Sequence, residues 1–373
     1  MRIKSNTSSA GEQARSAEAR GSARPGRGES KWFTSAVGGA VALGALALCG
    51  GSAYAAPITP PGEEAGLNAA SPLPEGVYFV NIFGTGGDYL IDDKKSNLTF
   101  DVPVILWATP WQPNFLGFNG RFEVIAAAPV IGNAGIPFCD TCGRNPLTGS
   151  TVQGVAPPLG GRDYTAMYNP FFEAGFAWDL GGGWGLSSFN GGYAPIDNEL
   201  RNFGQNIWVY NNRTWIGWSG NLWNGGLKDG STGPKFTFAA ESVYGLTGND
   251  VQTGARVKPD YWNVNLTGYA TLGKWELGVI AFGTTDIENF TYGAGQCGGV
   301  VGNMTAKCEQ SRWAVGPLVG YEFPGITLQA QYSIDVFDQN YRNIDGSKMA
   351  VNQFWLKSVI PLWNPPALEK PLK

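Results

Sequence analysis

No histidine occurs anywhere in the 373-residue chain, and this absence restricts the chemistry that the protein can perform. A Ser-His-Asp triad, a Cys-His pair and His-ligated zinc or iron sites are all excluded, because each of them needs an imidazole. Paired carboxylates remain as acid–base candidates, as in glycosidases; these are Asp101, Glu123, Glu276, Glu322 and Asp335. Carboxylates in a wet interior more often serve solvation or charge pairing. We therefore expect no enzyme, no metal and no cofactor.

Cysteines form a second group with possible chemistry. Cys139 and Cys142 belong to a C-D-T-C sequence, while Cys297 and Cys308 lie in a later Gly-rich stretch. A redox C-x-x-C is expected at a helix start, whereas this one lies among Gly and Pro. For an exported chain we expect oxidation, with two local disulfides as the simplest pairing. Four cysteines allow three connectivities, and the choice between them stays open.

Alternating apolar and polar residues indicate the elements that must position these groups. In P-G-I-T-L-Q-A-Q-Y-S-I-D-V (Pro324–Val336), one parity is apolar and the other polar, which is typical of a β-strand. Similar patterns predict strands at Val77–Phe83, Leu98–Leu106, Gly117–Ala127, Tyr164–Leu180, Trp184–Tyr193, Phe203–Trp218, Lys235–Tyr244, Tyr261–Leu272, Trp275–Ala281, Trp313–Phe323, Ile326–Val336 and Val351–Trp363. Asn211-Asn212 offers a split that would add one more strand.

The strand pattern predicts an all-β fold, an antiparallel transmembrane β-barrel of about 12 strands over residues 76–363. Closure is required in lipid, because no water satisfies the N–H and C=O groups of an unpaired edge. An even strand number argues against the split at Asn211-Asn212. It also places both cysteine loops outside and the turns at Gly181–Gly183, Gly273 and Pro324-Gly325 in the periplasm. A secreted β-sandwich is the alternative fold.

The N-terminal region reads as an export signal. A long basic leader precedes an apolar run, Ala36–Cys49, which is shorter than the roughly 20 residues of a membrane helix. Ala53-Tyr54-Ala55 then predicts cleavage, so residues 1–55 form a signal peptide. Lipidation at Cys49 is a less favoured alternative. Residues 56–75 are predicted to be a flexible periplasmic segment, with folding into the lumen as the alternative that composition does not decide, and residues 364–373 are predicted to be a C-terminal tail.

Composition agrees with an outer-membrane barrel of a Gram-negative bacterium. The chain contains 14 Trp, 14 Tyr, 20 Phe and 54 Gly, and only 15% of its residues are charged. Aromatic girdles and tight turns explain both excesses. The net charge of −4 includes no basic patch, so we expect no nucleic-acid partner. The expected partners are outer-membrane lipid and, during biogenesis, the barrel-assembly machinery.

Polar residues on the inner parity are the candidates for lining the lumen. They are Asp101, Arg121, Glu123, Arg312, Glu322, Gln329, Gln331, Asp335 and Lys357. Mixed-sign charges in a pore influence which solutes pass. The alternative, which we favour, is that these residues pair with one another and hold the barrel. A run of tryptophans at positions 208, 215, 218 and 223 is expected to anchor the barrel at the membrane interface more than to line a solute path.

Several stretches resemble the outer-membrane family named for the meta-pathway of phenol degradation. They are V-P-V-I-L-W-A-T-P-W (Val102–Trp111), F-T-F-A-A-E-S-V-Y-G (Phe236–Gly245), D-Y-W-N-V-N-L-T-G-Y-A (Asp260–Ala270), W-A-V-G-P-L-V-G-Y (Trp313–Tyr321) and S-V-I-P-L-W (Ser358–Trp363). The resemblance implies a barrel for passive uptake of small hydrophobic, often aromatic, solutes. It carries over no agreed binding residues. The chain departs from the usual barrel ending, because ten residues follow Trp363.

Two other functions remain open at this point. A structural or adhesive outer-membrane protein would act through disulfide-stapled external loops. A secreted β-sandwich would act as a soluble binding protein.

Overall fold

The computed structural model describes residues 58–91, 94–137, 161–197, 206–221, 233–293, 297, 305–340 and 352–365. The chain divides into two compact units, Met1–Gly50 and Gly51–Lys373, and every described residue belongs to the second. The predicted signal peptide, the lipidation alternative at Cys49, and the cysteines at 139 and 142 lie outside the described residues.

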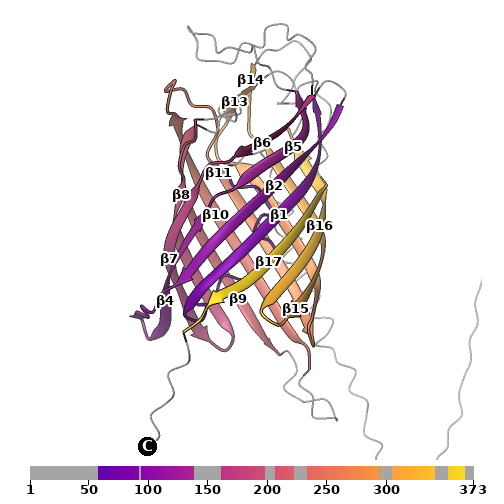
Figure 1. Ribbon diagram of the computed structural model, residues 1–373. Helices are drawn as coiled ribbons and strands as arrows, with labels where there is room; N and C mark the ends of the chain where they lie inside the picture. Colours follow the sequence, from indigo (N-terminus) through magenta and orange to yellow (C-terminus); the bar gives the residue numbers. More distant parts are fainter. Residues whose placement is uncertain are drawn as a thin grey trace, which may run out of the picture. The chain divides into compact units, whose positions relative to one another are not determined.

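The described chain is built from β-strands (Figure 1). They are β1 Gly76–Ile91, β2 Lys94–Ala108, β3 Asn114–Phe115, β4 Phe118–Ala127, β5 Val130–Pro137, β6 Gly161–Met167, β7 Phe171–Gly181, β8 Trp184–Tyr193, β9 Ile207–Asn221, β10 Lys235–Asp250, β11 Tyr261–Leu272, β12 Trp275–Asp286, β13 Phe290–Gly293, β14 Thr305–Cys308, β15 Ser311–Phe323, β16 Ile326–Gln339 and β17 Gln353–Trp363. None of the described residues belongs to a helix long and apolar enough to cross a membrane.

The strands close into an antiparallel barrel. The first strand, β1, pairs on one side with β2 and on the other with the last strand, β17. Two crossings of the wall are each divided into two strands, β4 with β5 and β6 with β7, so the barrel has 12 crossings. The predicted barrel is therefore confirmed. Closure between first and last strands excludes the β-sandwich.

Prolines explain the two divided crossings. Pro129 lies between β4 and β5, and Pro170 lies between β6 and β7. Proline lacks an N–H group and cannot donate to the ladder. Both proline carbonyls still accept a hydrogen bond from the adjacent segment of the wall. Tyr168 N donates to the Pro129 carbonyl at 2.7 Å, and Ala194 N donates to the Pro170 carbonyl at 2.9 Å. The wall is thus continuous across each interruption.

Two details bear on the predicted strands. The predicted unbroken strand through Asn211-Asn212 is confirmed, since β9 pairs residue by residue with β10 there. The prediction that a loop begins after Ala127 is wrong, because Val130–Pro137 form β5 and pair with both β2 and β6. Small residues and glycine hide the alternation in β5, so only the pairing of its backbone identifies it as a strand.

Short turns gather at one end of the barrel, which we call the turn end. The turns at Gly182-Gly183, Gly273-Lys274 and Pro324-Gly325 lie at the end where β1 begins and β17 ends. Gly273 has a φ of +63°, a left-handed conformation that glycine adopts without strain. The small hairpin β13–β14 lies at the opposite end, which we call the hairpin rim (Figure 1).

The two faces of the wall have opposite chemistry. In β12 the outward Val279 is 65% exposed, whereas its neighbour Ile280, which faces inward, is 2% exposed. In β16 the outward residues are apolar and the buried ones include Gln329, Gln331 and Ser333. Exposed aromatic side chains lie near the turn end, namely Trp107, Trp184, Trp275, Phe323 and Trp363, and near the hairpin rim, namely Phe172, Trp208, Tyr210 and Trp262. Apolar surface outside and polar groups inside invert the pattern of a soluble protein.

Candidate functional site in the barrel lumen

The barrel interior holds the N-terminal stretch of residues 58–75, which we call the lumen segment. Ile58, Ala65 and Ala70 of this segment are all 0% exposed. The expectation of a flexible segment therefore differs from the structure. An irregular backbone needs partners for its N–H and C=O groups, and the polar inner wall supplies them.

Lys357 and Gln331 hold the middle of the lumen segment. The Lys357 ammonium, whose residue is 1% exposed, donates to the carbonyls of Gly62, at 3.2 Å, and Ala65. The Gln331 amide donates to the same Ala65 carbonyl at 2.7 Å, and its oxygen accepts from Lys357 at 3.2 Å. Gly66 makes this approach possible, since its φ is +91° and a Cβ there would lie 1.9 Å from Gln331 Nε2.

Hydrogen bonds from β11 fix the same region from another side. Gly62 N donates to Asn265 Oδ1 at 3.2 Å, and Gly66 N donates to Thr267 Oγ1 at 2.7 Å. The segment is therefore tied to β16 and β17, which are neighbours in the wall, and to β11, which β12 and β15 separate from β16.

Arg213 on β9 lies in a buried group of charges. Its guanidinium forms ion pairs with Glu173 at 3.1 Å, with Glu241 at 3.5 Å and with Glu64 of the lumen segment. The guanidinium carbon also lies 5.1 Å from the centre of the Phe171 ring. Breaking a buried ion pair leaves an uncompensated charge, which is strongly destabilising. The Glu64 contact therefore couples the lumen segment to the wall.

Glu63, next to this group, experiences several charges. Burial raises the pKa of the Glu63 carboxyl to about 7, and the Glu241 carboxylate adds to this increase. The cations of Arg213 and Lys357 oppose it. Neutral Glu63 is therefore the form that the docked segment favours.

The first residues of the segment fit a socket of aromatic and amide side chains, which we call the Ile58 socket. Tyr168 donates its hydroxyl to the Ile58 carbonyl at 2.8 Å. The Thr59 hydroxyl lies 2.9 Å from Tyr261 Oη and accepts from Asn211 Nδ2 at 2.9 Å. Asn263 donates to the Thr59 carbonyl at 3.0 Å.

The last part of the segment contacts strands near the turn end. Leu73 N donates to Glu123 Oε1 at 2.9 Å, and Ser187 Oγ donates to the Ala69 carbonyl at 2.7 Å. Ala70 packs in a small cluster with Trp215, which is 2% exposed. Of the predicted girdle residues, Trp208 faces outward, Trp215 faces the lumen segment and Trp218 is half-buried; Trp223 lies outside the described residues.

The predicted lumen residues divide by their contacts. Glu123, Gln331 and Lys357 contact the lumen segment. The others bond within the wall: Asp101 accepts from Asn81, Arg121 donates to the Thr109 carbonyl, Gln329 donates to Glu276, and Arg312 pairs with Asp335 at 2.8 Å. Glu322 is exposed beside the Pro324-Gly325 turn.

Sequence reasoning missed Arg213, which pairs with Glu64 of the lumen segment, and its two carboxylate partners in the wall. Arg213, Glu173 and Glu241 were not among the predicted lumen residues, although Glu241 lies on the polar parity of β10. Arg213 lies in a stretch rich in Trp and Asn, where alternation is weak. The polar parity of each strand is the signal that locates them.

An open hollow of about 460 Å³ lies in the wall near the hairpin rim. Its lining consists of Pro170, Phe171, Phe172, Gly191, Gly192, Tyr193, Ala194, Trp208, Val209 and Tyr210. Phe172 and Trp208 are exposed on the outer face, whereas Phe171, Tyr193 and Val209 are buried on the inner face. The lining thus includes residues of both faces, and β7, β8 and β9 remain paired through Gly191 and Gly192.

Strand pairing in the wall changes beside this hollow. Strand β8 ends at Tyr193, which pairs with Phe171 and Val209. Among the described strands, β6 pairs with β5.

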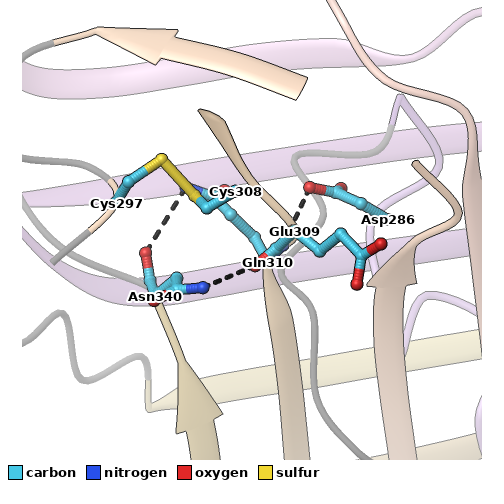
Figure 2. The surroundings of a disulfide bond; sticks show 6 residues. All are labelled: Asp286, Cys297, Cys308, Glu309, Gln310 and Asn340. Atoms are coloured by element: carbon cyan, nitrogen blue, oxygen red, sulfur yellow. Dashed lines mark hydrogen bonds between the residues drawn. A yellow bond between two sulfur atoms is a disulfide. The ribbon is translucent and has the colours of Figure 1, made fainter. Parts of the chain in front are cut away.

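One disulfide staples the hairpin at the rim (Figure 2). It joins Cys297 and Cys308, the later of the two predicted local pairs. Gln310 N, next to it, donates to Asp286 Oδ2 at 2.9 Å, and Asn340 Nδ2 donates to the Glu309 carbonyl at 2.8 Å. The hairpin base is thereby anchored to the ends of β12 and β16. Within the described ranges, His, Cys, Asp and Glu do not cluster in a way that would hold a metal ion.

Comparisons with known proteins leave the family open. No family model matches the chain, and no curated protein matches it. Solved structures with some likeness include the COG4313 outer membrane channel from Pseudomonas putida F1, with 13% identity, a TM-score of 0.49, and coverage of 79% of this chain and 98% of that chain. The CymD monoaromatic hydrocarbon channel has 10% identity, a TM-score of 0.36, and coverage of 84% and 95%. The NanC porin has 9% identity, a TM-score of 0.40, and coverage of 76% and 100%. Since these TM-scores are below 0.5, the likeness does not identify the family of this chain.

Proposed function

We propose that the protein is an outer-membrane channel for small hydrophobic solutes. The supporting features are the export signal, the closed barrel, its apolar outer face with two aromatic zones, and its polar interior. The resemblance to the family named for phenol degradation points to aromatic solutes. On this proposal the protein works passively and is not an enzyme, and its partners are outer-membrane lipid, the solute and the assembly machinery.

The observation that carries the proposal is the continuity between an aromatic inner wall and the hollow. Tyr168 and Tyr193 have ring centres 6.3 Å apart, and Phe171 and Tyr193 have ring centres 4.7 Å apart. Phe171 and Tyr193 also line the hollow, whose outer side carries Phe172 and Trp208. A hydrophobic solute that follows this wall reaches the outer face of the barrel, where lipid lies, without crossing a polar surface.

The lumen segment acts as a removable closure in this proposal. Its contacts with the wall include hydrogen bonds, ion pairs and apolar packing, which can be broken and remade. Lys357 makes two of these bonds to backbone carbonyls. Hydrogen bonds to charged groups contribute about 1.5–3 kcal/mol each, so the loss of Lys357 should expose the lumen measurably.

Single-channel recording of the mature chain in a planar bilayer tests the proposal. We expect Lys357→Met to raise the open fraction about tenfold, because the segment loses its strongest donor. Phenol or toluene in the bath should then block the current, while a neutral sugar should not. Lys274→Met is the matched control, since Lys274 is exposed in a turn.

A second readout covers solutes that leave through the wall and carry no current. Cells with the channel in their outer membrane should take up toluene faster than cells with an empty vector, and Lys357→Met should increase the rate further. Absence of aromatic block together with unchanged uptake would exclude a hydrophobic-solute channel.

The stapled hairpin favours a second candidate, an adhesive outer-membrane protein. The hairpin β13–β14 forms its own two-stranded sheet at the rim and is held by a disulfide, as a partner-binding loop would be. Replacing Cys297 and Cys308 by Ser discriminates: lost surface binding with intact solute flux would support adhesion. Deleting residues 131–161 would not serve, because it removes strand β5.

A further inference from the structure

We propose that the Ile58 socket is the solute-binding site, and that Ile58-Thr59 occupies it as an internal stand-in for the solute. The ligand class that fits is a small neutral molecule with a compact apolar body and one adjacent hydroxyl or carbonyl oxygen. This inference rests on the proposed channel function and specifies its substrate.

The apolar part of the socket is built from inward-facing side chains. Ile58 is 0% exposed and belongs to the largest buried cluster, together with Tyr168, Phe171, Tyr193 and Val209. The Ile58 side chain is branched and uncharged. A deep position among aromatic rings suits a small ring or branched alkyl group.

The polar part of the socket consists of donors that converge on adjacent oxygens. Tyr168 Oη and Asn263 Nδ2 donate to the backbone carbonyls of Ile58 and Thr59, and Asn211 Nδ2 donates to the Thr59 hydroxyl. When the segment leaves, these buried donors lose their acceptors, and each unsatisfied group costs about 1–3 kcal/mol. A solute oxygen restores the bond, whereas a pure hydrocarbon does not.

The charge of the ligand follows from the partners of Ile58 and Thr59. The side chains of Tyr168, Tyr261, Asn211 and Asn263 that bond to these two residues are neutral at physiological pH. Arg213, whose guanidinium lies over the Phe171 ring of the socket, is already engaged by carboxylates. A neutral alcohol, phenol or ketone therefore fits better than a carboxylate or an amine.

The position of the socket connects it to the proposed route. Phe171, Tyr193 and Val209 belong both to the cluster around Ile58 and to the lining of the hollow in the wall. A solute released from the socket toward these residues enters the hollow directly. The same site therefore serves for closure when Ile58-Thr59 fills it and for passage when a solute does.

Binding measurements with two isosteric probes test the inference. We would record ¹⁹F NMR spectra of 4-fluorophenol and 4-fluorotoluene with the mature chain in lipid nanodiscs. A mature chain shortened to begin at Pro60 lacks both Ile58 and Thr59, which frees the socket, and 4-fluorophenol should bind to it about tenfold more tightly than to the native chain. Adding Tyr168→Phe should weaken 4-fluorophenol roughly fivefold, by loss of one hydrogen bond, and leave 4-fluorotoluene unchanged.

Controls separate binding in the socket from partition into lipid. Empty nanodiscs measure partition, and Tyr321→Phe removes a hydroxyl from a strand end remote from the socket. In the native chain, 4-fluorophenol should also increase hydrogen exchange of residues 58–66, and 4-fluorotoluene should not. This second measurement needs no variant and remains decisive if Tyr168→Phe fails to fold.

Equal binding of the two probes, or an unchanged 4-fluorophenol affinity in Tyr168→Phe, would overturn the inference. Different results would reject the proposed channel function. Block and uptake of aromatics without a preference for the hydroxyl would reject the socket and keep the channel. Probe binding as expected but without block or uptake would keep the socket and reject the channel.

Discussion

Charged side chains with almost no exposure dominate the barrel interior at the scale of single residues. Arg213 is 2% exposed and Lys357 is 1% exposed, and both bond to the lumen segment. Transferring an ion from water into a protein interior is costly unless partners compensate it. Because the segment supplies part of that compensation, it contributes to the stability of the barrel as well as closing the lumen.

Glu63 makes the docking of the segment depend on pH. Its pKa is about 7 when docked and near 4.5 when free, because burial disfavours the carboxylate. The docked state is therefore fully favoured below pH 4.5, weakens as the pH rises toward 7, and changes little above that. The total loss is on the order of 3 kcal/mol. After correction for the intrinsic increase of exchange with pH, the protection of residues 58–75 against hydrogen exchange should be lower at pH 7.5 than at pH 5.

A neutral replacement checks this assignment. In Glu63→Gln the pH dependence of exchange should shrink, while any remainder reports other carboxylates near Arg213. An unchanged dependence in the variant would show that Glu63 does not control docking.

At the scale of elements, the lumen segment depends on glycine where it passes the wall. Gly66 combines a φ of +91° with close approach to Gln331 and Leu318. Gly66→Ala adds backbone strain of about 1–2 kcal/mol and a clash, so the segment should dissociate from β16. We expect higher conductance and faster proteolysis within residues 58–75.

Gly254→Ala is the matched control for that change. Gly254 has a φ of +68°, but a Cβ there would have no heavy atom within 4 Å. The two variants share the strain and differ in the clash. Similar conductance in both would mean that contact with Gln331 does not hold the segment.

At the scale of the whole molecule, the closed barrel and the stapled hairpin are separate in their pairing. Strands β13 and β14 pair only with each other among the described strands, whereas the wall closes through β1 and β17. The disulfide closes a loop with a sequence separation of 11 residues. A cross-link of this length contributes about 3 kcal/mol in the chain-entropy model, and we expect this contribution to remain local.

Reduction should therefore loosen the hairpin and leave the barrel folded. Hydrogen exchange should increase at residues 290–293 and 305–308, while the heat-modifiable migration of the barrel stays the same. The double variant with Ser at 297 and 308 should show no further change in the hairpin on reduction, which controls for Cys139 and Cys142. A lower unfolding temperature of the barrel after reduction would contradict this separation.

Alternation along single strands was sufficient to predict the architecture. In β16 the parity of Gln329 and Gln331 against Tyr332 and Ile334 distinguishes the inner face from the outer face, and the count of such segments predicts a 12-stranded barrel. Local pattern carries this information because side chains alternate sides in every strand. Pairing across the chain is not local, so strand β5, with its small residues, was taken for a loop.

The sequence by itself determined the barrel, its inner and outer faces and the absence of imidazole chemistry, since each of these depends on residue type and short-range spacing. Only the tertiary structure decided what fills the lumen. The carbonyls of Gly62 and Ala65 accept hydrogen bonds from Lys357, which lies 295 and 292 residues further along the chain. Such contacts follow from closure of the barrel around the segment. Composition of residues 56–75 therefore suggested a flexible linker, whereas the polar inner wall provides the partners that hold it.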